Sequence, residues 1–280
     1  MPELPEVETT CRGIEPHIKG IVVRSITVRQ PQLRWLIPDQ ISSSVPGQRL
    51  LEVQRRAKYI LLKFSRGDII IHLGMSGSLR VLSTGQLPAK HDHFDISFCN
   101  GVVLRLTDPR RFGAVLWQGV DQPHKLLQNL GPEPLTETFT AKTFITAAKG
   151  RKVSVKQFVM DNKVVVGVGN IYAAEALFAA AIHPQTPVNQ VSADKFNKLV
   201  AAIKFILAQA IERGGTTLKD FVGGDGKPGY FAQELQVYGR KGESCNACLK
   251  PLKEIRLGQR STVYCPNCQR LPRIRKNSGK

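Results

Sequence analysis

Four cysteines near the end of the chain constrain its fold more than any other feature. They form two Cys-x-x-Cys pairs, Cys245 with Cys248 and Cys265 with Cys268. This spacing is typical of a zinc ribbon, in which each pair turns two thiolates toward one tetrahedral ion. Four protein ligands leave no position open for water, so we predict one structural Zn²⁺ per chain. Metal binding then supplies the folding energy of a segment too small to hold itself with a core.

The residues between the two pairs predict a β-hairpin. Glu254–Leu257 and Ser261–Tyr264 have the pattern of two strands, with Gly258, Gln259 and Arg260 at the tip. A positive tip on a rigid hairpin is suited to gripping phosphates. A redox dithiol function is disfavoured because two pairs occur together without a thioredoxin-like βαβ pattern.

The charge of the chain indicates a polyanionic partner. Lys and Arg number 40 against 22 Asp and Glu, giving a net charge of +18. Nucleic acid is the leading candidate and an anionic membrane surface is second. Residues 239–280 hold eleven basic and two acidic side chains, a net charge of +9, so half of the excess lies there. This skew predicts a phosphate-binding element at the C-terminal end.

Two absences in the sequence argue against a membrane or secreted protein. No stretch approaches about 20 apolar residues, and the N-terminus lacks the basic and apolar regions of a signal peptide. Cys11 and Cys99 stand alone, which is no disulfide framework, and we expect both to be buried as small apolar groups. These features favour a cytoplasmic protein.

The first half of the chain changes from a helical to a β pattern. An apolar stripe at spacings of three and four predicts an N-terminal helix: Leu4, Val7, Cys11, Ile14 and Ile18. From about residue 21 to 117, short stretches rich in Val, Ile and Leu predict strands at residues 21–30, 48–64 and 68–73. The dipeptide Asn100-Gly101 predicts a two-residue hairpin. Several short strands at close spacing indicate a sandwich or barrel.

A Gly-Pro-Glu-Pro sequence at residues 131–134 predicts a linker, after which the pattern is helical. Residues 171–181 and 196–211 predict two helices, the second ended by Gly214 and Gly215. The glycine-rich stretch at residues 223–229 predicts a loop.

The N-terminus offers a possible nucleophile. Removal of Met1 would leave Pro2 with a free secondary amine, whose reference pKa of about 7.7–8.0 is well below that of lysine. Attack on an aldehyde-level carbon would give a cationic iminium that favours elimination, and Glu3 could move protons. The residues alone favour a plainer interpretation, since proline is common at this position and glutamate often caps a helix.

A series of motifs resembles the formamidopyrimidine-DNA glycosylase family, in order and over nearly the whole chain. The motifs are PELPEVE at residues 2–8, RRAKY at 55–59, HLGMSG at 72–77, TDPRRFG at 107–113, MDN at 160–162, VGVGNIY at 166–172, GGTTL at 214–218, KPGY at 227–230 and the cysteine finger with Gln259-Arg260. So many independent matches do not arise by chance.

The resemblance implies an α+β fold of two domains. Residues 1–131 would form a catalytic β-sandwich flanked by helices, and residues 132–242 a helix-two-turns-helix domain. A zinc finger at residues 243–270 and a basic tail at 271–280 would follow. The implied activity is that of a bifunctional DNA glycosylase/AP lyase of base excision repair. It would excise oxidised purines (8-oxoguanine, formamidopyrimidines) through a Schiff base at the N-terminal proline and β,δ-elimination.

The resemblance also implies roles for individual residues. Those expected to be catalytic are Pro2, Glu3, Lys58 and Arg260, with Glu6 as a supporting carboxylate. Those expected to contact DNA are Met75, His91, Arg110, Arg111, Phe112, Lys156, Asn170, Lys219 and Tyr238. Met75, Arg110 and Phe112 correspond to a set that fills the gap left by an everted base. For Met75 and Phe112 taken alone, core packing is the better interpretation.

The implied partner is double-stranded DNA with oxidised bases or abasic sites, bound by a monomer in the bacterial cytoplasm and nucleoid. Two alternatives stay open. An endonuclease VIII-like glycosylase would use the same proline on oxidised pyrimidines. A non-catalytic zinc-ribbon DNA-binding protein would explain the charge and the cysteines, but not the joint presence of Pro2, Glu3 and Lys58.

Overall fold

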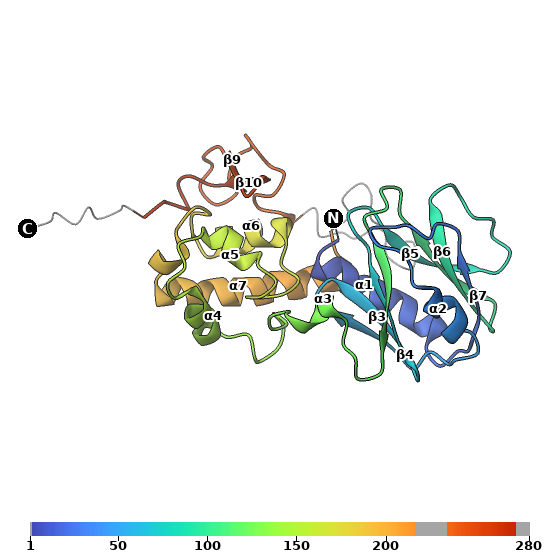
Figure 1. Ribbon diagram of the computed structural model, residues 1–280. Helices are drawn as coiled ribbons and strands as arrows, with labels where there is room; N and C mark the ends of the chain where they lie inside the picture. Colours follow the sequence, from blue (N-terminus) through green and yellow to red (C-terminus); the bar gives the residue numbers. More distant parts are fainter. Residues whose placement is uncertain (1, 217–233, 273–280) are drawn as a thin grey trace, which may run out of the picture. The chain divides into compact units, whose positions relative to one another are not determined.

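The computed structural model describes residues 2–216 and 234–272, which divide into two compact units (Figure 1). The first unit contains residues 2–130 and 209–216, and the second contains residues 131–208 and 234–272. The long helix α7 (Ala193–Glu212) runs through the division. The predicted loop at residues 223–229 and the predicted DNA contact Lys219 lie outside the described residues.

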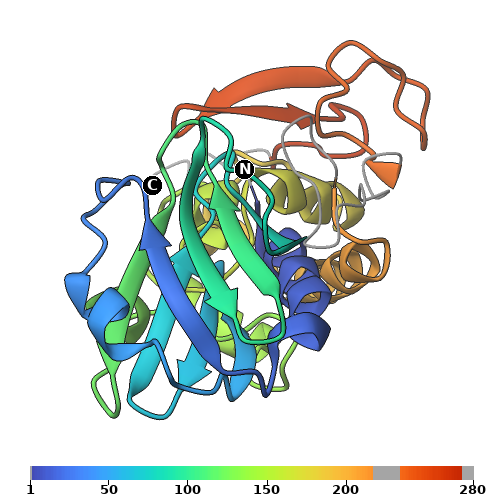
Figure 2. The same cartoon turned by 90° about the vertical axis from the view of Figure 1, so that its right-hand side faces the viewer.

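The first unit is a sandwich of two antiparallel sheets (Figure 2, blue to green arrows). One sheet has the order β1-β6-β7-β5 and the other β2-β3-β4-β8. Their bounds are β1 (Val23–Val28), β5 (Ser78–Ser83), β6 (Asp92–Phe98), β7 (Val102–Thr107), β2 (Glu52–Arg56), β3 (Tyr59–Phe64), β4 (Gly67–His72) and β8 (Ala114–Gly119). A single core joins them, with Leu62, Phe94 and Val115 among its fully buried members. Two short helices, α2 (Asp39–Ser44) and α3 (Lys125–Gln128), complete the unit.

Helix α1 (Leu4–Ile18) packs the Val7, Cys11, Ile14 and Ile18 side chains of its apolar stripe into the same core. The five predicted positions are all buried: Leu4, Val7, Cys11, Ile14 and Ile18. Each fully buried aliphatic side chain contributes about 1.5–3 kcal/mol, so this face alone secures the helix to the sheets. Cys11 is buried as expected, whereas the expectation for Cys99 is wrong, because that side chain is exposed at the end of β6.

The sequence predicts one of two tight turns in the sandwich and does not predict the other. The hairpin of β6 and β7 turns at Asn100-Gly101, where Gly101 has φ +83°, and confirms the prediction. Strands β2 and β3 are joined by Ala57 and Lys58, with Ala57 in the left-handed region at φ +54°. No glycine, proline or asparagine marks this second turn, so the sequence predicted only a β-rich stretch there.

Helices build the body of the second unit. They are α4 (Ala141–Ala148), α5 (Val155–Val159), α6 (Asn170–Ala179), the 3₁₀ turn η1 (Val188–Gln190) and most of α7. The rings of Phe139, Phe158 and Phe196 surround Phe144, with centroid distances of 4.9–5.7 Å. Both predicted helices are confirmed in α6 and α7. Among the described residues, no helix is long and apolar enough to cross a membrane.

Glycines end α7 as predicted, and a two-stranded hairpin follows later in the chain. Gly214 and Gly215 have φ +76° and +82°, and the Gly215 N–H donates to the Ala210 carbonyl at 2.7 Å. The hairpin consists of β9 (Lys253–Leu257) and β10 (Arg260–Tyr264) in antiparallel register. Its turn is Gly258-Gln259, both at positive φ, so Arg260 is the first residue of β10 rather than part of the turn.

Candidate functional site

The start of the chain is held by two glutamates. The backbone N–H of Glu3 donates to Glu6 Oε2 at 2.8 Å, and the Glu3 side chain accepts from the first turn of α1, which makes a reciprocal capping box. The other carboxylate oxygen of Glu6 accepts the N–H of Thr216 at 2.8 Å. Pro2, Glu3 and Glu6 are all buried. Glu6 therefore caps the helix and also fastens it to the chain just beyond α7.

The turn that carries Lys58 is tied to the same helix. Arg55 on β2 donates through Nε to Glu8 Oε2 of α1 at 2.8 Å, and through Nη1 to the Ala57 carbonyl at 3.1 Å. One guanidinium thus fixes both the helix and the left-handed residue that precedes Lys58. The ammonium of Lys58 lies near the ring of His72, whose pKa it helps to lower.

His72, at the end of β4, is a site residue whose individual role the sequence reasoning missed. Burial, followed by the positive charges of Lys58 and Arg34, lowers its pKa to about 4, so the ring is neutral at neutral pH. Its Nδ1 accepts the Gly74 N–H at 3.0 Å, which leaves the proton on Nε2. The ring also contacts that of Tyr59, at 5.1 Å between centroids. A histidine inside a matched motif was the available signal.

Two loops of the sandwich present exposed apolar groups around a hollow of about 560 Å³. Met75 follows β4 and is 39% exposed, and Phe112 precedes β8 and is 45% exposed. The Arg110 guanidinium lies 4.9 Å from the centre of the Phe112 ring. Arg111, at φ +54°, lines the same hollow. Core packing is therefore the wrong interpretation for Met75 and Phe112, whose side chains face solvent.

His91 stands at the end of a loop that buried charges hold in place. Arg105 of β7 donates to the carbonyls of Gln86 and Leu87 at 3.1 and 3.2 Å, and to Asp95 at 2.8 Å. The carboxylate of Asp92, next to His91, accepts the Ala89 N–H at 2.8 Å. His91 also lines a concave surface with Lys90 and Arg111, which is a cationic surface suited to phosphate.

In the second unit, Lys156 lies deeper than the sequence suggested. It is 1% exposed, and its ammonium donates to Asn170 Oδ1 and to Thr262 Oγ1, both at 2.6 Å. Asn170 in turn donates from Nδ2 to the Ser261 carbonyl at 3.1 Å. Lys156 therefore joins the first residue of α6 to strand β10, and a direct contact of this lysine with DNA stays a prediction.

Tyr238 is placed by a buried carboxylate. Glu175 of α6 accepts three backbone N–H groups, from Gln236, Val237 and Tyr238, at 2.8, 3.0 and 2.8 Å. Burial raises the pKa of Glu175, although these three donors oppose the shift. Asn170 begins the same helix, directly after the N-cap Gly169, as the sequence predicted. One helix therefore organises two predicted phosphate contacts, and its amide terminus can itself bind phosphate.

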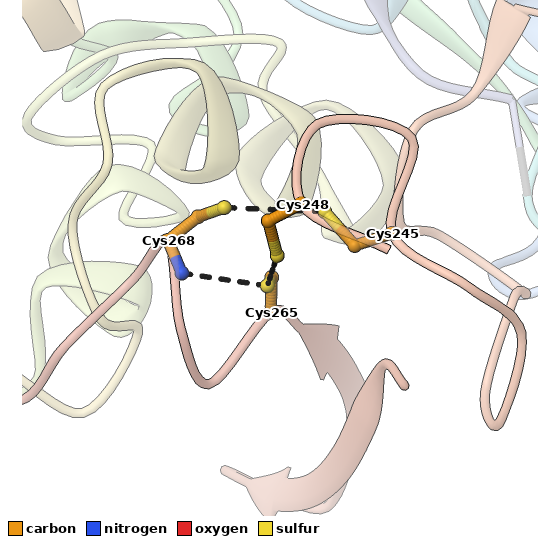
Figure 3. A group of neighbouring side chains, drawn as sticks. All are labelled: Cys245, Cys248, Cys265 and Cys268. Carbon is orange, nitrogen blue, oxygen red and sulfur yellow. Dashed lines mark hydrogen bonds between the residues drawn. The ribbon is translucent and has the colours of Figure 1, made fainter. Parts of the chain in front are cut away.

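The four cysteines converge as the sequence predicted (Figure 3). Their sulfur atoms all lie within 4.8 Å of one another, with 3.4 Å between Cys248 and Cys265 and 4.0 Å between Cys245 and Cys268. Tetrahedral bonds of about 2.3 Å place thiolates about 3.8 Å apart, so the cluster fits Zn²⁺. The four cysteines form a site for one structural zinc ion.

Arg260 lies on the hairpin between the two cysteine pairs, and its side chain is exposed. Gln269, just after the last cysteine, accepts the Cys265 N–H at 2.9 Å and donates to the Ile182 carbonyl at 2.9 Å. The finger is thus hydrogen-bonded to the helical part of its own unit, which limits the freedom of the hairpin.

A sandwich led by a capped helix, a helical unit and a four-cysteine finger define an α+β protein built like a DNA-repair glycosylase. Three family profiles match the chain in order. They describe the formamidopyrimidine-DNA glycosylase N-terminal domain (residues 1–115), its H2TH domain (residues 130–222) and a zinc finger found in FPG and IleRS (residues 239–271). The chain belongs to the formamidopyrimidine-DNA glycosylase family, and the expected fold class is confirmed.

Individual relatives agree over nearly the full length. The chain is 57% identical over 270 residues to the formamidopyrimidine-DNA glycosylase of Pseudomonas aeruginosa (strain LESB58), covering 96% of this chain and 100% of that protein. A structure of Lactococcus lactis Fpg with an abasic site containing DNA has a TM-score of 0.89 at 33% identity, covering 96% of this chain and 99% of that one. The MutM (FPG) protein from Thermus thermophilus has a TM-score of 0.84 at 34% identity, covering 97% and 100%.

Proposed function

We propose that this protein is a bifunctional DNA glycosylase/AP lyase that removes oxidised purines from double-stranded DNA. The observation that carries the proposal is the common fastening of Pro2, Glu3 and the Lys58 turn to helix α1. The capping box holds Glu3, which directly follows Pro2, and the link from Glu8 through Arg55 to Ala57 holds the turn. Relatives named for the glycosylase activity and family structures that contain damaged DNA support the assignment.

The chemistry begins at the amine of Pro2, once Met1 has been removed. The nitrogen forms a bond to C1′ of the damaged nucleotide, and the bond from C1′ to the base breaks, with the base leaving as its protonated form. Opening of the sugar ring gives a cationic iminium between Pro2 and C1′. Glu3, which follows Pro2 and takes part in the capping box, would move a proton to or from the sugar.

Two eliminations complete the reaction. The iminium draws electrons from C2′, so a C2′ proton leaves and the 3′ phosphate is expelled. A second elimination expels the 5′ phosphate, and water then releases Pro2 from the sugar remnant. In this scheme Lys58 and Arg260 supply positive charge to the departing phosphates. No step requires a redox cofactor, and the zinc ion has a structural part.

The DNA contacts come from both units. Met75, Arg110 and Phe112 form a wedge that fills the gap left by the everted base. His91 and Arg111 from the first unit, and Asn170, Tyr238 and Arg260 from the second, bind phosphates. Lys156 keeps its proposed role as a DNA contact, and its ammonium also bonds to Asn170. Lys219 keeps its proposed role near the everted base, outside the described residues.

We further propose the domain division at residues 131, 242 and 270, a monomeric enzyme, and action in the bacterial cytoplasm on nucleoid DNA. The bacterial origin of the relatives supports this location.

Borohydride trapping tests the proposal. The protein is incubated with a duplex that carries 8-oxoguanine opposite cytosine, in the presence of borohydride, which reduces an iminium to a permanent crosslink. We expect a covalent adduct that maps to the N-terminal peptide. The variants Pro2→Gly and Lys58→Ala should lose most of it, and an undamaged duplex should give none.

Each other outcome has a definite meaning. An adduct only with a duplex of oxidised pyrimidines would assign the endonuclease VIII-like activity instead. Tight binding to all duplexes with no adduct and no cleavage would show a non-catalytic DNA-binding protein. An adduct that maps to an internal lysine would refute the role of Pro2 while leaving the glycosylase assignment intact.

A further inference from the structure

We propose that Asp108 is a positioning residue, which holds the loops bearing Met75, Arg110 and Phe112 in one arrangement before DNA is bound. The inference rests on the proposed function, because it concerns how the wedge enters the base stack. Asp108 follows β7 directly and is fully buried, at 0% exposure. A carboxylate in such a place must be satisfied by donors, and the identity of those donors indicates what it organises.

The carboxylate of Asp108 joins two separate loops. Oδ2 accepts the Gly113 N–H at 2.7 Å, and Oδ1 accepts the Arg110 N–H at 3.3 Å, so both ends of the Arg110–Phe112 stretch bind one side chain. Oδ1 also accepts the hydroxyl of Ser76 at 3.2 Å. Ser76 directly follows Met75, so the loop after β4 is fixed to the loop before β8.

The backbone of Asp108 also binds the end of the loop that precedes β6 and bears His91. Its N–H donates to the His91 carbonyl at 3.0 Å. Its carbonyl accepts from the Arg111 N–H at 3.2 Å and from His93 Nε2 at 2.9 Å. Every polar group of this one residue is therefore engaged with a segment that bears a proposed DNA contact.

Glycines allow the loop after β4 and the loop before β8 to pack in direct backbone contact. A Cβ at Gly74, which has φ +64°, would lie 2.5 Å from the backbone of Phe112 and Gly113. A Cβ at Gly113 would lie 2.9 Å from Asp108 Oδ2 and 2.8 Å from the His72 carbonyl. The loops are thus in direct backbone contact, and Asp108 is the side chain that bonds to both.

This arrangement has a clear physical use. Met75 and Phe112 are partly exposed to water, and both lie on loops that Asp108 holds through hydrogen bonds to their neighbours. Everting a base costs stacking and pairing energy, and a wedge recovers part of it only if it enters the stack already shaped. Loosened loops would lower the fraction of molecules whose Met75 and Phe112 are arranged to enter the base stack. The reaction rate would then fall on substrates whose damaged base must be unstacked.

The test compares two substrates in single-turnover reactions: a duplex with 8-oxoguanine opposite cytosine, and the same duplex with an abasic site. Asp108→Asn keeps the size of the side chain but sets an NH₂ group against a backbone donor. We expect the rate on 8-oxoguanine to fall 30-fold or more, and the rate on the abasic duplex to fall less than 3-fold. The matched control is Asp68→Asn, a buried aspartate bonded to Lys63 and Gln118, which should lower neither rate more than 3-fold.

A second variant covers the case in which Asp108→Asn fails to fold. Ser76→Ala removes only the bond to the Met75 loop, and we expect a 3- to 10-fold loss confined to 8-oxoguanine. Equal losses on both substrates, or no loss, in the folded variants would overturn the positioning role. A wild-type protein inactive on both duplexes would refute the proposed function itself, which is a distinguishable result.

Discussion

The two units of the molecule support their working residues in different ways. In the sandwich, which has a large apolar core, buried carboxylates support these residues. Glu6 holds the start of α1, and Asp108 holds the loops that bear Met75 and Phe112. In the finger, the apolar cluster is small and includes the ligands themselves, with Val237, Leu252 and Val263 beside the cysteines. A metal ion and a buried ammonium, Lys156, take over the part that the core plays in the sandwich.

The difference teaches where each unit is vulnerable. A core of many aliphatic side chains distributes its stability, so the loss of one hydrogen bond loosens a loop but leaves the sheets intact. A finger stabilised by one ion concentrates its stability, so the loss of that ion removes the structure that carries Arg260. Four predictions, in order of decreasing effect on the free energy of unfolding, test this contrast.

The largest effect is expected from zinc removal. A chelator, or Cys265→Ser, should unfold the hairpin β9–β10, because structural zinc contributes an apparent 10–16 kcal/mol or so in finger peptides. Hydrogen exchange should show loss of protection in β9 and β10 and none in β4. DNA affinity should fall about 100-fold or more. The control Cys99→Ser alters an exposed cysteine outside the finger and should change nothing. Loss of protection in β4 as well would contradict the contrast.

Replacement of the buried ammonium should come next. Lys156→Met leaves Asn170 Oδ1 and Thr262 Oγ1 without their donor, which costs about 2–4 kcal/mol. Denaturant unfolding of the zinc-loaded protein measures this change. Lys152→Met, at an exposed position of the same segment, is the control and should cost less than about 0.5 kcal/mol. Equal costs for the two variants would show that the ammonium does not join α6 to β10.

A smaller effect is expected in the sandwich, where the free energy of unfolding should depend on pH through His72. The folded pKa of His72, about 4, lies below the ordinary value of 6.5, so the unfolded chain binds more protons between these values. The contribution of the neutral His72 ring to the free energy of unfolding is fully present above about pH 6.5 and is lost as pH falls toward 4. It amounts to about 2 kcal/mol after allowance for partial exposure.

Urea unfolding at pH 7 and pH 4.5 measures this loss. His72→Asn, which keeps an acceptor for the Gly74 N–H, should flatten the pH dependence by about that amount. The control variant is His17→Asn, at an exposed histidine. An unaltered slope in His72→Asn would remove the basis for a neutral ring beside Lys58.

The smallest effect on stability is expected at the hairpin tip. Arg260→Ala removes an exposed side chain and should change the unfolding free energy by less than about 0.5 kcal/mol. DNA affinity should nevertheless fall, and the slope of log K against log salt should decrease by about one, as for one lost phosphate contact. Arg256→Ala, exposed on β9, is the control for charge alone. Identical slopes in the two variants would deny Arg260 a specific contact.

The sequence predicted those parts of the fold that local chemistry determines. The helix from Leu4 follows from apolar spacing, the hairpin at Asn100-Gly101 from the freedom of glycine at positive φ, and the metal site from cysteine spacing. In each case one short stretch contains the whole signal, so no long-range information was needed.

The parts that escaped prediction depend on residues far apart in the chain. Lysine is ordinarily a surface residue, and only the hydrogen bonds to Asn170 and Thr262 make the burial of Lys156 favourable. Ala57 adopts a left-handed conformation that its sequence does not favour, and Arg55, bonded to α1, holds it there. The lowered pKa of His72 likewise depends first on burial by the fold, and then on the charges of Lys58 and Arg34, which come from other segments.

The hydrogen bond between Glu6 and Thr216 has a consequence for how the enzyme is made. It joins residues 210 apart, so the setting of the N-terminus is complete only after three-quarters of the chain has been synthesised. At about 5–20 residues per second, this takes roughly 10–40 s on the ribosome. Until then the first turn of α1 lacks this bond, which leaves time for the removal of Met1 that the proposed function requires.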